Sequence, residues 1–262
     1  MIIFLYHQIA PVSPQHDPLG LAVPPDRFEA HMRALYRRGW RCVPLSDYVA
    51  AVQARTHRTS PWRHTFALTF DDGFQDVYTT VRPILQQFGF TAAIFPVVNH
   101  VGRYSEWAGQ DGERSAPLLT WEQLAELARA GFEIGSHTLT HPRLPALPLD
   151  ALDRELNRSR QILEERLGVP VTLLSYPYSA HTPAIQQRVA TAGYQAACGG
   201  NRGAWSVFNL RRTQCLRGDG GLRFRVKAAG WQERSAALLE DTPLGQTLRP
   251  LVRRLRRRRK ED

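Results

Sequence analysis

Short apolar runs alternate along the chain with longer amphipathic stretches. The run 66–70 (Phe-Ala-Leu-Thr-Phe) is typical of a buried strand, whereas 150–167 repeats leucine and isoleucine at helical spacing with charged residues between them. Strands that alternate with helices indicate parallel βαβ units. The pattern predicts strands at 2–6, 41–44, 66–70, 91–98, 132–136, 171–176, 194–198 and 207–213, and helices near 25–38, 46–54, 74–88, 121–130, 150–167, 182–192 and 222–231.

This alternation continues through most of the 262 residues without an interior linker. We therefore predict an α/β fold, a single irregular (β/α) barrel of about seven parallel strands over residues 1–240. A basic, helical tail is expected over residues 241–262. Two loop-rich stretches, 10–24 and 99–119, interrupt the pattern, and the second is long enough to be functional.

The net charge of +10 is concentrated at the C-terminus. Residues 249–262 contain eight basic and two acidic side chains, so the rest of the chain carries only +4. This balance argues against a nucleic-acid-binding protein. The tail has apolar residues at helical spacing among its arginines. It is interpreted either as an amphipathic segment that contacts an anionic membrane through residues 244–260 or as a solvated chain end.

Two further patterns bear on where the protein works. Its three cysteines, Cys42, Cys198 and Cys215, are an odd number without a close pair, which is typical of a reducing compartment. The first residues have neither the basic segment nor the cleavage site of a signal peptide, and no run of about 18 apolar residues occurs. We expect a cytoplasmic protein.

Two groups of metal-binding side chains follow predicted strands. Asp71 and Asp72 end the run Thr-Phe-Asp-Asp, and His137 and His141 come directly after another strand. Active sites of such barrels form where strands end. Two histidines four residues apart suit a single metal ion, and with one carboxylate they leave a coordination position for water. Either pair alone is compatible with a polar turn, but together they predict a catalytic metal site.

With these motifs the sequence resembles the metal-dependent polysaccharide deacetylases, which include chitin-oligosaccharide and peptidoglycan deacetylases. The resemblance covers roughly residues 1–231 and rests on the runs Thr-Phe-Asp-Asp-Gly and Ser-His-Thr-x-x-His. It implies that Asp72, His137 and His141 are the metal ligands. It also implies that Asp71 is the general base.

A third motif of the family, an aromatic residue after proline, is present here as Tyr-Pro-Tyr. The resemblance implies that the backbone N–H of Tyr178 helps to hold the oxyanion. This chain has Ser175 where many members have an arginine that orients the catalytic aspartate. In a subset of the family that arginine comes from a later Leu-x-Arg run, so Arg212 is predicted to be the partner of Asp71; the alternative is a surface charge.

The general acid departs from the family pattern. Many members use a late histidine, but no histidine follows His181 here. The Tyr-His pair that ends the first predicted strand resembles that of a rearranged subgroup, the poly-N-acetylglucosamine deacetylases, in which this histidine is the acid. We therefore predict His7 as the general acid, with His181 as the runner-up and a purely structural His7 as the alternative.

The resemblance implies a hydrolase that removes an acetyl group from an N-acetylated sugar, either in a polysaccharide or in a lipid-linked or nucleotide-linked precursor. The expected cofactor is a divalent metal, with zinc favoured over cobalt and nickel. Tyr104 and Trp107 are candidates for stacking on a sugar ring, or they simply pack their loop. An O-acetyl sugar esterase and an inactive sugar-binding barrel are the alternative functions.

Overall fold

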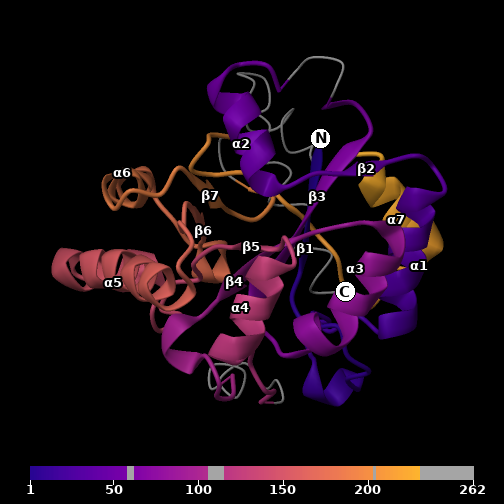
Figure 1. Cartoon of the computed structure of the whole chain (residues 1–262), viewed down its shortest axis with the longest axis horizontal. Helices are drawn as coiled ribbons and strands as arrows, with labels where there is room; N and C mark the ends of the chain where they lie inside the picture. The colour runs from indigo at the N-terminus through magenta and orange to yellow at the C-terminus, as the bar shows by residue number, and fades with distance from the viewer. Residues whose placement is uncertain (58–61, 106–114, 203–204, 231–262) are drawn as a thin grey trace, which may run out of the picture.

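The computed structural model describes residues 1–57, 62–105, 115–202 and 205–230, and Figure 1 shows its strands gathered in the middle of the molecule with helices around them. The strands are β1 (Ile2–Tyr6), β2 (Arg41–Cys42), β3 (Thr65–Asp72), β4 (Ala93–Pro96), β5 (Glu133–Ile134), β6 (Leu173–Ser175), β7 (Ala196–Cys198) and β8 (Thr213–Gln214). The helices are α1 (Pro25–Tyr36), α2 (Leu45–Gln53), α3 (Arg82–Phe88), α4 (Trp121–Arg129), α5 (Leu149–Leu167), α6 (Pro183–Thr191) and α7 (Gly221–Ala228). Within the described ranges, no helix has both the length and the apolar character needed to cross a membrane.

The strands close into a ring. Six of them form one parallel sheet in the order β5-β4-β3-β1-β8, with β2 beside the beginning of β3, and β6 and β7 form a second parallel pair. Isolated parallel bridges join the two sheets at both edges. Ser136 N donates to Leu173 O (2.9 Å) at one edge, and Leu210 N donates to Ala197 O (2.8 Å) at the other. The prediction of an irregular barrel of about seven parallel strands is confirmed.

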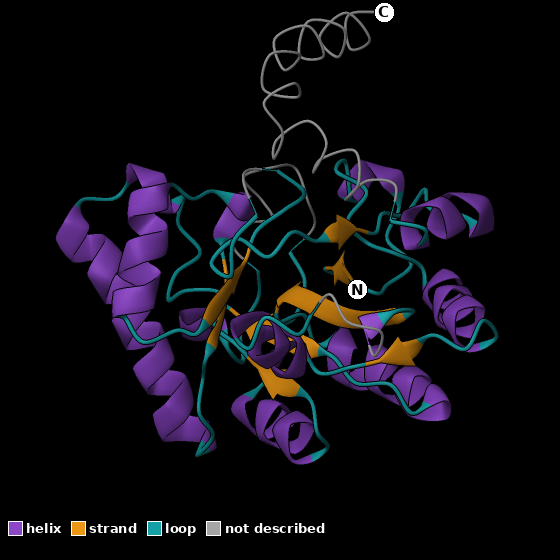
Figure 2. Cartoon of the chain, turned by 90° about the horizontal axis from the view of Figure 1, so that it is seen from above, coloured by secondary structure: helices purple, strands orange, loops and turns teal. Residues whose placement is uncertain are grey.

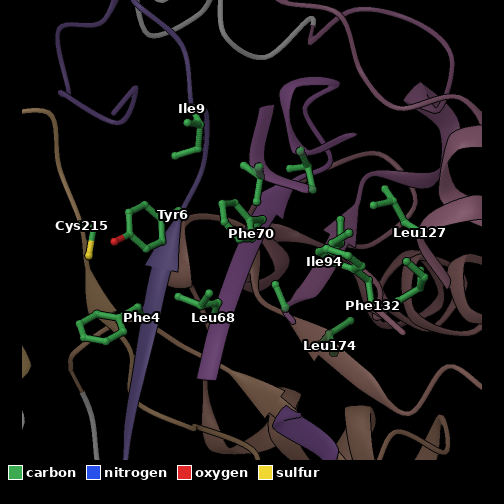
Figure 3. Packing of buried hydrophobic residues seen from close by; sticks show 14 of the residues in the cluster. Phe4, Tyr6, Ile9, Leu68, Phe70, Ile94, Leu127, Phe132, Leu174 and Cys215 are labelled. Carbon is green, nitrogen blue, oxygen red and sulfur yellow. The ribbon is translucent and has the colours of Figure 1, made fainter. Parts of the chain in front are cut away.

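Alternate strand residues face two different cores, as the period of a strand requires. Phe4 of β1 and Leu68 and Phe70 of β3 belong to the larger core, which lies between the strands and the outer helices (Figures 2 and 3). Residues of the opposite parity fill the inside of the ring, together with side chains from α2. From the strands and the segment before β8 these are Ile3, Ala67, Ala93, Phe95, Leu173, Ala196, Cys198 and Leu210, and from α2 they are Leu45 and Val49. Asp71 has the parity of Ala67, so it continues the inward series to the end of β3.

Most of the predicted strands are shorter in the structure, and two elements differ most from their predicted extent. The predicted helix 74–88 is regular only in its second half, α3, and a wider turn precedes it. Pro83 has no N–H with which to continue regular helical bonding. The predicted strand 207–213 is reduced to β8, because Leu210 pairs with β7 whereas Thr213 pairs with β1. This segment crosses from one sheet to the other.

Three predictions fall on residues outside the described ranges. They concern the domain boundary at residue 240, the tail 241–262 with its membrane contact, and Trp107. Each stays a prediction.

Candidate active site

The candidate site lies at one edge of the barrel, where the strands end. Parallel strands present their C-terminal ends at the same edge, so residues far apart in the sequence meet there. In chain order these residues are His7 after β1, Asp71 and Asp72 at the end of β3, His137 and His141 after β5, Tyr178 after β6 and Arg212 before β8.

The three predicted metal ligands form one cluster. The ligand atoms of Asp72, His137 and His141 all lie within 4.8 Å of one another. Nε2 of each histidine lies 3.4 Å from Oδ1 of Asp72. All three side chains are buried, so solvent does not screen the carboxylate from the imidazoles.

Hydrogen bonding assigns the proton of His137 and tests whether the cluster suits a metal. Nδ1 of His137 lies 2.8 Å from the carbonyl oxygen of Ser175, which can only accept, so Nδ1 carries the proton. In the neutral ring Nε2 is then an acceptor, and it faces a second acceptor, Oδ1 of Asp72. Two buried acceptors in contact need a positive charge between them, either a proton or a metal cation. The donor set, two imidazoles and a carboxylate, fits a divalent metal ion.

The pKa shifts of the three predicted ligands also indicate that the cluster favours a positive charge. Burial lowers the pKa of His141 to about 3, which keeps this imidazole neutral and available as a ligand. Burial acts on His137 in the same direction, but the carboxylates of Asp71 and Asp72 outweigh it and raise the pKa of His137. Burial alone would raise the pKa of Asp72, yet its histidine neighbours lower it, so this carboxyl group is ionised.

Strained backbone is concentrated at this edge of the barrel. Left-handed conformations of non-glycine residues cost on the order of 1–3 kcal/mol each and persist only where the surroundings impose them. Seven described non-glycine residues have a positive φ, and five of them lie at or beside the cluster: Asp72, Thr138, His141, Tyr178 and Ser179. The fold therefore holds the site's side chains in place at a cost in backbone energy.

Asp71 is held by a buried ion pair with Arg212. The guanidinium donates from Nη1 to Oδ1 (2.8 Å) and from Nη2 to Oδ2 (2.7 Å). Ser175 donates to Oδ2 of Asp71 (3.0 Å) and accepts from Arg212 (2.9 Å), so it bridges the pair. Burial alone would raise the pKa of Asp71, but Arg212 holds it well below its usual range. Arg212 is 1% exposed, so the alternative of a surface charge is wrong.

The structure separates the two candidate acids. His7 and Asp72 line the same small cavity, and Nδ1 of His7 is buried with no hydrogen-bond partner among the described residues. Burial lowers the pKa of His7. His181 instead lies with its Nδ1 3.1 Å from the side-chain nitrogen of Gln186, and its described contacts do not include the cluster. Of these two histidines, His7 is the one that shares a cavity with Asp72.

Aromatic residues complete the edge of the site. The ring of Tyr178 lies 4.7 Å from that of His141, and the guanidinium of Arg143 lies 4.0 Å above the Tyr178 ring. This stack places the Tyr178 ring beside the ligand cluster. Tyr104 is 61% exposed, and no described contact joins it to the metal ligands, so the structure does not bring it into the site.

Sequence reasoning missed one buried acid near the cluster, Glu155 on α5. Its carboxyl group accepts hydrogen bonds from the loop between the two ligand histidines. A signal was available, because Glu155 shares the apolar face of its helix with the buried residues Leu152, Leu156 and Leu163. A charged residue in such a stripe is rarely buried without partners.

Known proteins resemble the chain in sequence and in fold. The family model described as polysaccharide deacetylase matches residues 59–197. YxkH of Bacillus subtilis (strain 168), assigned to the polysaccharide deacetylases, is 27% identical over 226 residues, which cover 85% of this chain and 74% of that protein. The poly-beta-1,6-N-acetyl-D-glucosamine N-deacetylase of Escherichia coli (strain K12) is 40% identical over 75 residues, which cover 27% of this chain and only 11% of that enzyme. The solved deacetylase PplD of Streptococcus pyogenes, in complex with acetate, has a TM-score of 0.73 at 23% identity, over 86% of this chain and 96% of that one.

Proposed function

Since the chain belongs to the polysaccharide deacetylase family, we propose that it is a metal-dependent hydrolase that removes the acetyl group from an N-acetylated sugar. One observation carries the proposal: two adjacent buried carboxylates have different partners. Asp72 faces the imidazoles of His137 and His141, whereas Asp71 faces the guanidinium of Arg212. One carboxylate is available to a metal, and the other stays an ionised base.

Each residue has a distinct task in this reaction. When bound, a divalent metal supplies Lewis acidity, which lowers the pKa of water and polarises a carbonyl group. Asp71 takes a proton from the attacking water while the water oxygen bonds to the acetamide carbon. The backbone N–H of Tyr178 donates to the carbonyl oxygen as that oxygen becomes negative. His7 gives a proton to the nitrogen as the C–N bond breaks, and acetate and a free amine leave.

The environment of each proton carrier supports this division of roles. Arg212 keeps Asp71 ionised and fixes the direction of its carboxylate through two hydrogen bonds. Burial lowers the pKa of His7, which makes its protonated form a stronger acid toward the leaving nitrogen.

Zinc is the metal that we propose for the Asp72, His137 and His141 cluster. Two imidazoles and one carboxylate are a donor set typical of catalytic zinc, and they leave a position open to water. Cobalt and nickel accept the same donors, so metal content decides between them. Zinc in the purified protein at about one ion per chain, with activity lost to a chelator and restored by Zn²⁺, is the expected outcome.

The substrate that we propose is a chain or precursor containing N-acetylglucosamine. Support comes from the Escherichia coli relative, whose name states that sugar. The test measures acetate and free amine together, on β-1,6-linked and β-1,4-linked N-acetylglucosamine oligomers. Equal amounts of both products would support N-deacetylation. Acetate without amine from an O-acetylated sugar would indicate an esterase, and no product with sugar binding would indicate an inactive barrel.

A further inference from the structure

The loop that carries both histidine ligands belongs to no helix or strand. It runs from the end of β5 to His141, and two of its residues, Thr138 (φ 69°) and His141 (φ 63°), have left-handed backbones. Left-handed conformations persist only where the surrounding structure imposes them. The backbone N–H groups of Val98 and Asn99 hold one side of this loop by donating to Thr138 O (3.2 Å) and Leu139 O (3.0 Å). Something outside it must fix the separation of the two ligand nitrogens.

Glu155 holds this loop from the neighbouring helix α5. Its Oε2 accepts from the backbone N–H groups of Leu139 (2.8 Å) and Thr140 (2.9 Å). Its Oε1 accepts from the hydroxyl group of Thr140 (2.6 Å). All three donors lie between His137 and His141 in the sequence, and Glu155 is only 8% exposed. One buried carboxyl group therefore ties the midpoint of the ligand loop to the helix.

We propose that Glu155 is a positioning residue for the metal centre: it sets the distance between the two ligand imidazoles and so determines metal affinity. The inference rests on the proposed function, since it takes Asp72, His137 and His141 to be the ligands. Glu155 acts at one remove, through the backbone of Leu139 and Thr140. Partners that hydrogen-bond a metal ligand typically change the affinity of the site 10- to 100-fold when they are substituted, and Glu155 holds the backbone that joins two such ligands.

The chain contains a matched control for this role. Glu133 at the beginning of β5 also accepts two backbone hydrogen bonds, from Leu45 N (2.6 Å) and Ser46 N (2.9 Å), at the start of α2. Its partners lie at the other end of β5 from His137. Glu133 and Glu155 thus both accept backbone N–H groups, Glu133 at the first turn of a helix and Glu155 in a loop, and only that loop carries the proposed metal ligands.

The experiment titrates metal-free full-length protein with Zn²⁺ alone and measures the dissociation constant by calorimetry. We expect Glu155→Gln to bind Zn²⁺ about 10- to 100-fold more weakly than the unsubstituted protein. Glu133→Gln should bind Zn²⁺ within about twofold of the unsubstituted protein, even if it unfolds at a lower temperature. Equal weakening in both variants, or unchanged affinity in Glu155→Gln, overturns the proposal.

Two further variants keep the result decisive. If Glu155→Gln does not fold, Thr140→Val removes only the hydroxyl bond and should weaken Zn²⁺ binding several-fold; unchanged affinity in that variant overturns the proposal. Asp72→Asn tests the proposed metal site itself. If the unsubstituted protein binds Zn²⁺ no better than Asp72→Asn, the proposed function fails first, and this outcome is distinct from a failure of the role of Glu155.

Discussion

Two buried histidines, His31 and His137, each have one ring nitrogen at a backbone carbonyl group, but their other ring nitrogens face different partners. Nε2 of His31 lies 2.7 Å from the carbonyl oxygen of Asp219, and Nδ1 of His137 lies 2.8 Å from that of Ser175. In each ring the nitrogen at the carbonyl must donate, so the other nitrogen is an acceptor. For His31 that acceptor meets the hydroxyl group of Tyr6 (3.1 Å). For His137 it meets a carboxylate.

The surroundings of the two rings differ in the same sense. His31 stacks on Phe224, with ring centroids 3.9 Å apart, and its neighbour Asp219 is paired with Lys227. None of the described positive φ angles belongs to residues of that network, whereas five of them lie at the candidate site. Burial of a histidine beside an acid does not by itself indicate a functional site. A histidine nitrogen that acts as an acceptor and faces a carboxylate oxygen, on strained backbone, does indicate one.

The largest effect is expected from Asp72→Asn. The amide cannot serve as an anionic ligand, so Zn²⁺ affinity should collapse and acetate release should fall about 10³-fold or more, since a metal contributes several kcal/mol to such a transition state. The same amide has N–H groups that can donate to the two imidazoles. Metal-free Asp72→Asn should therefore unfold at a higher temperature than the metal-free unsubstituted protein.

Calorimetric unfolding with and without Zn²⁺ checks whether the variant unfolds at a higher temperature than the unsubstituted protein when both are metal-free. A variant less stable than the unsubstituted protein in the metal-free state would show that the acceptors at His137 are already satisfied. The contrast between the two histidines would then disappear.

Asp71→Asn should separate the two adjacent carboxylates. The substitution removes the base but none of the three metal ligands, so kcat should fall about 10²- to 10⁴-fold. Zn²⁺ affinity should stay within a few-fold of the unsubstituted value. A variant that loses the metal instead would assign Asp71 to the coordination sphere and contradict the division of roles.

Residue types and spacing predicted the side chains of the candidate site better than the residues that hold those side chains in place. The strand-end rule and the two motifs identified the residues that now lie together, because side chains at the ends of parallel strands meet whatever the details of the loops. The pairing of Arg212 with Asp71 needed the family resemblance, since neighbouring arginines look alike in a sequence. Glu155 was missed because two of its three hydrogen-bond partners are backbone groups, which residue types do not specify; only its place on the apolar face of α5 indicated burial.

The fold shows the same division between what patterns predict and what they do not. Continuous apolar runs located β1 and β3, whose residues are buried without exception. The short strands were harder to delimit. The segment around Leu210 pairs first with β7 and then with β1, so its bonding changes partner within a few residues. Periodicity reports which face is buried, and it does not report which strand lies next to it.

The pH dependence of stability should report on the structural histidine. Burial lowers the pKa of His31 from 6.5 to about 4. Between these values the unfolded chain binds a proton at His31 and the folded protein does not, so the contribution of His31 to the free energy of unfolding falls as the pH falls through this window. The slope is at most about 1.4 kcal/mol per pH unit, or about 3 kcal/mol in total.

His31→Gln should remove this contribution from the stability profile between pH 6.5 and 4, and His16→Gln, at an exposed histidine, should leave the profile unchanged. Urea unfolding at several pH values measures both. An identical slope in the unsubstituted protein and in His31→Gln would place the responsible protonation elsewhere.

The smallest effect is expected from Tyr6→Phe, which removes one hydroxyl group, the donor to His31 and a hydrogen-bond partner of Cys215. The ring of Tyr6 is packed in the core beside Phe70 and Cys215, so the substitution keeps its volume (Figure 3). It leaves the acceptor nitrogen of His31 buried without its partner, which costs about 1–3 kcal/mol. Urea unfolding should show this loss, while kcat and Zn²⁺ affinity stay within about twofold of the unsubstituted values. A large fall in kcat would mean that β1 transmits the change from Tyr6 to the next residue, His7. The contacts of His31 and those of the candidate site would then be coupled.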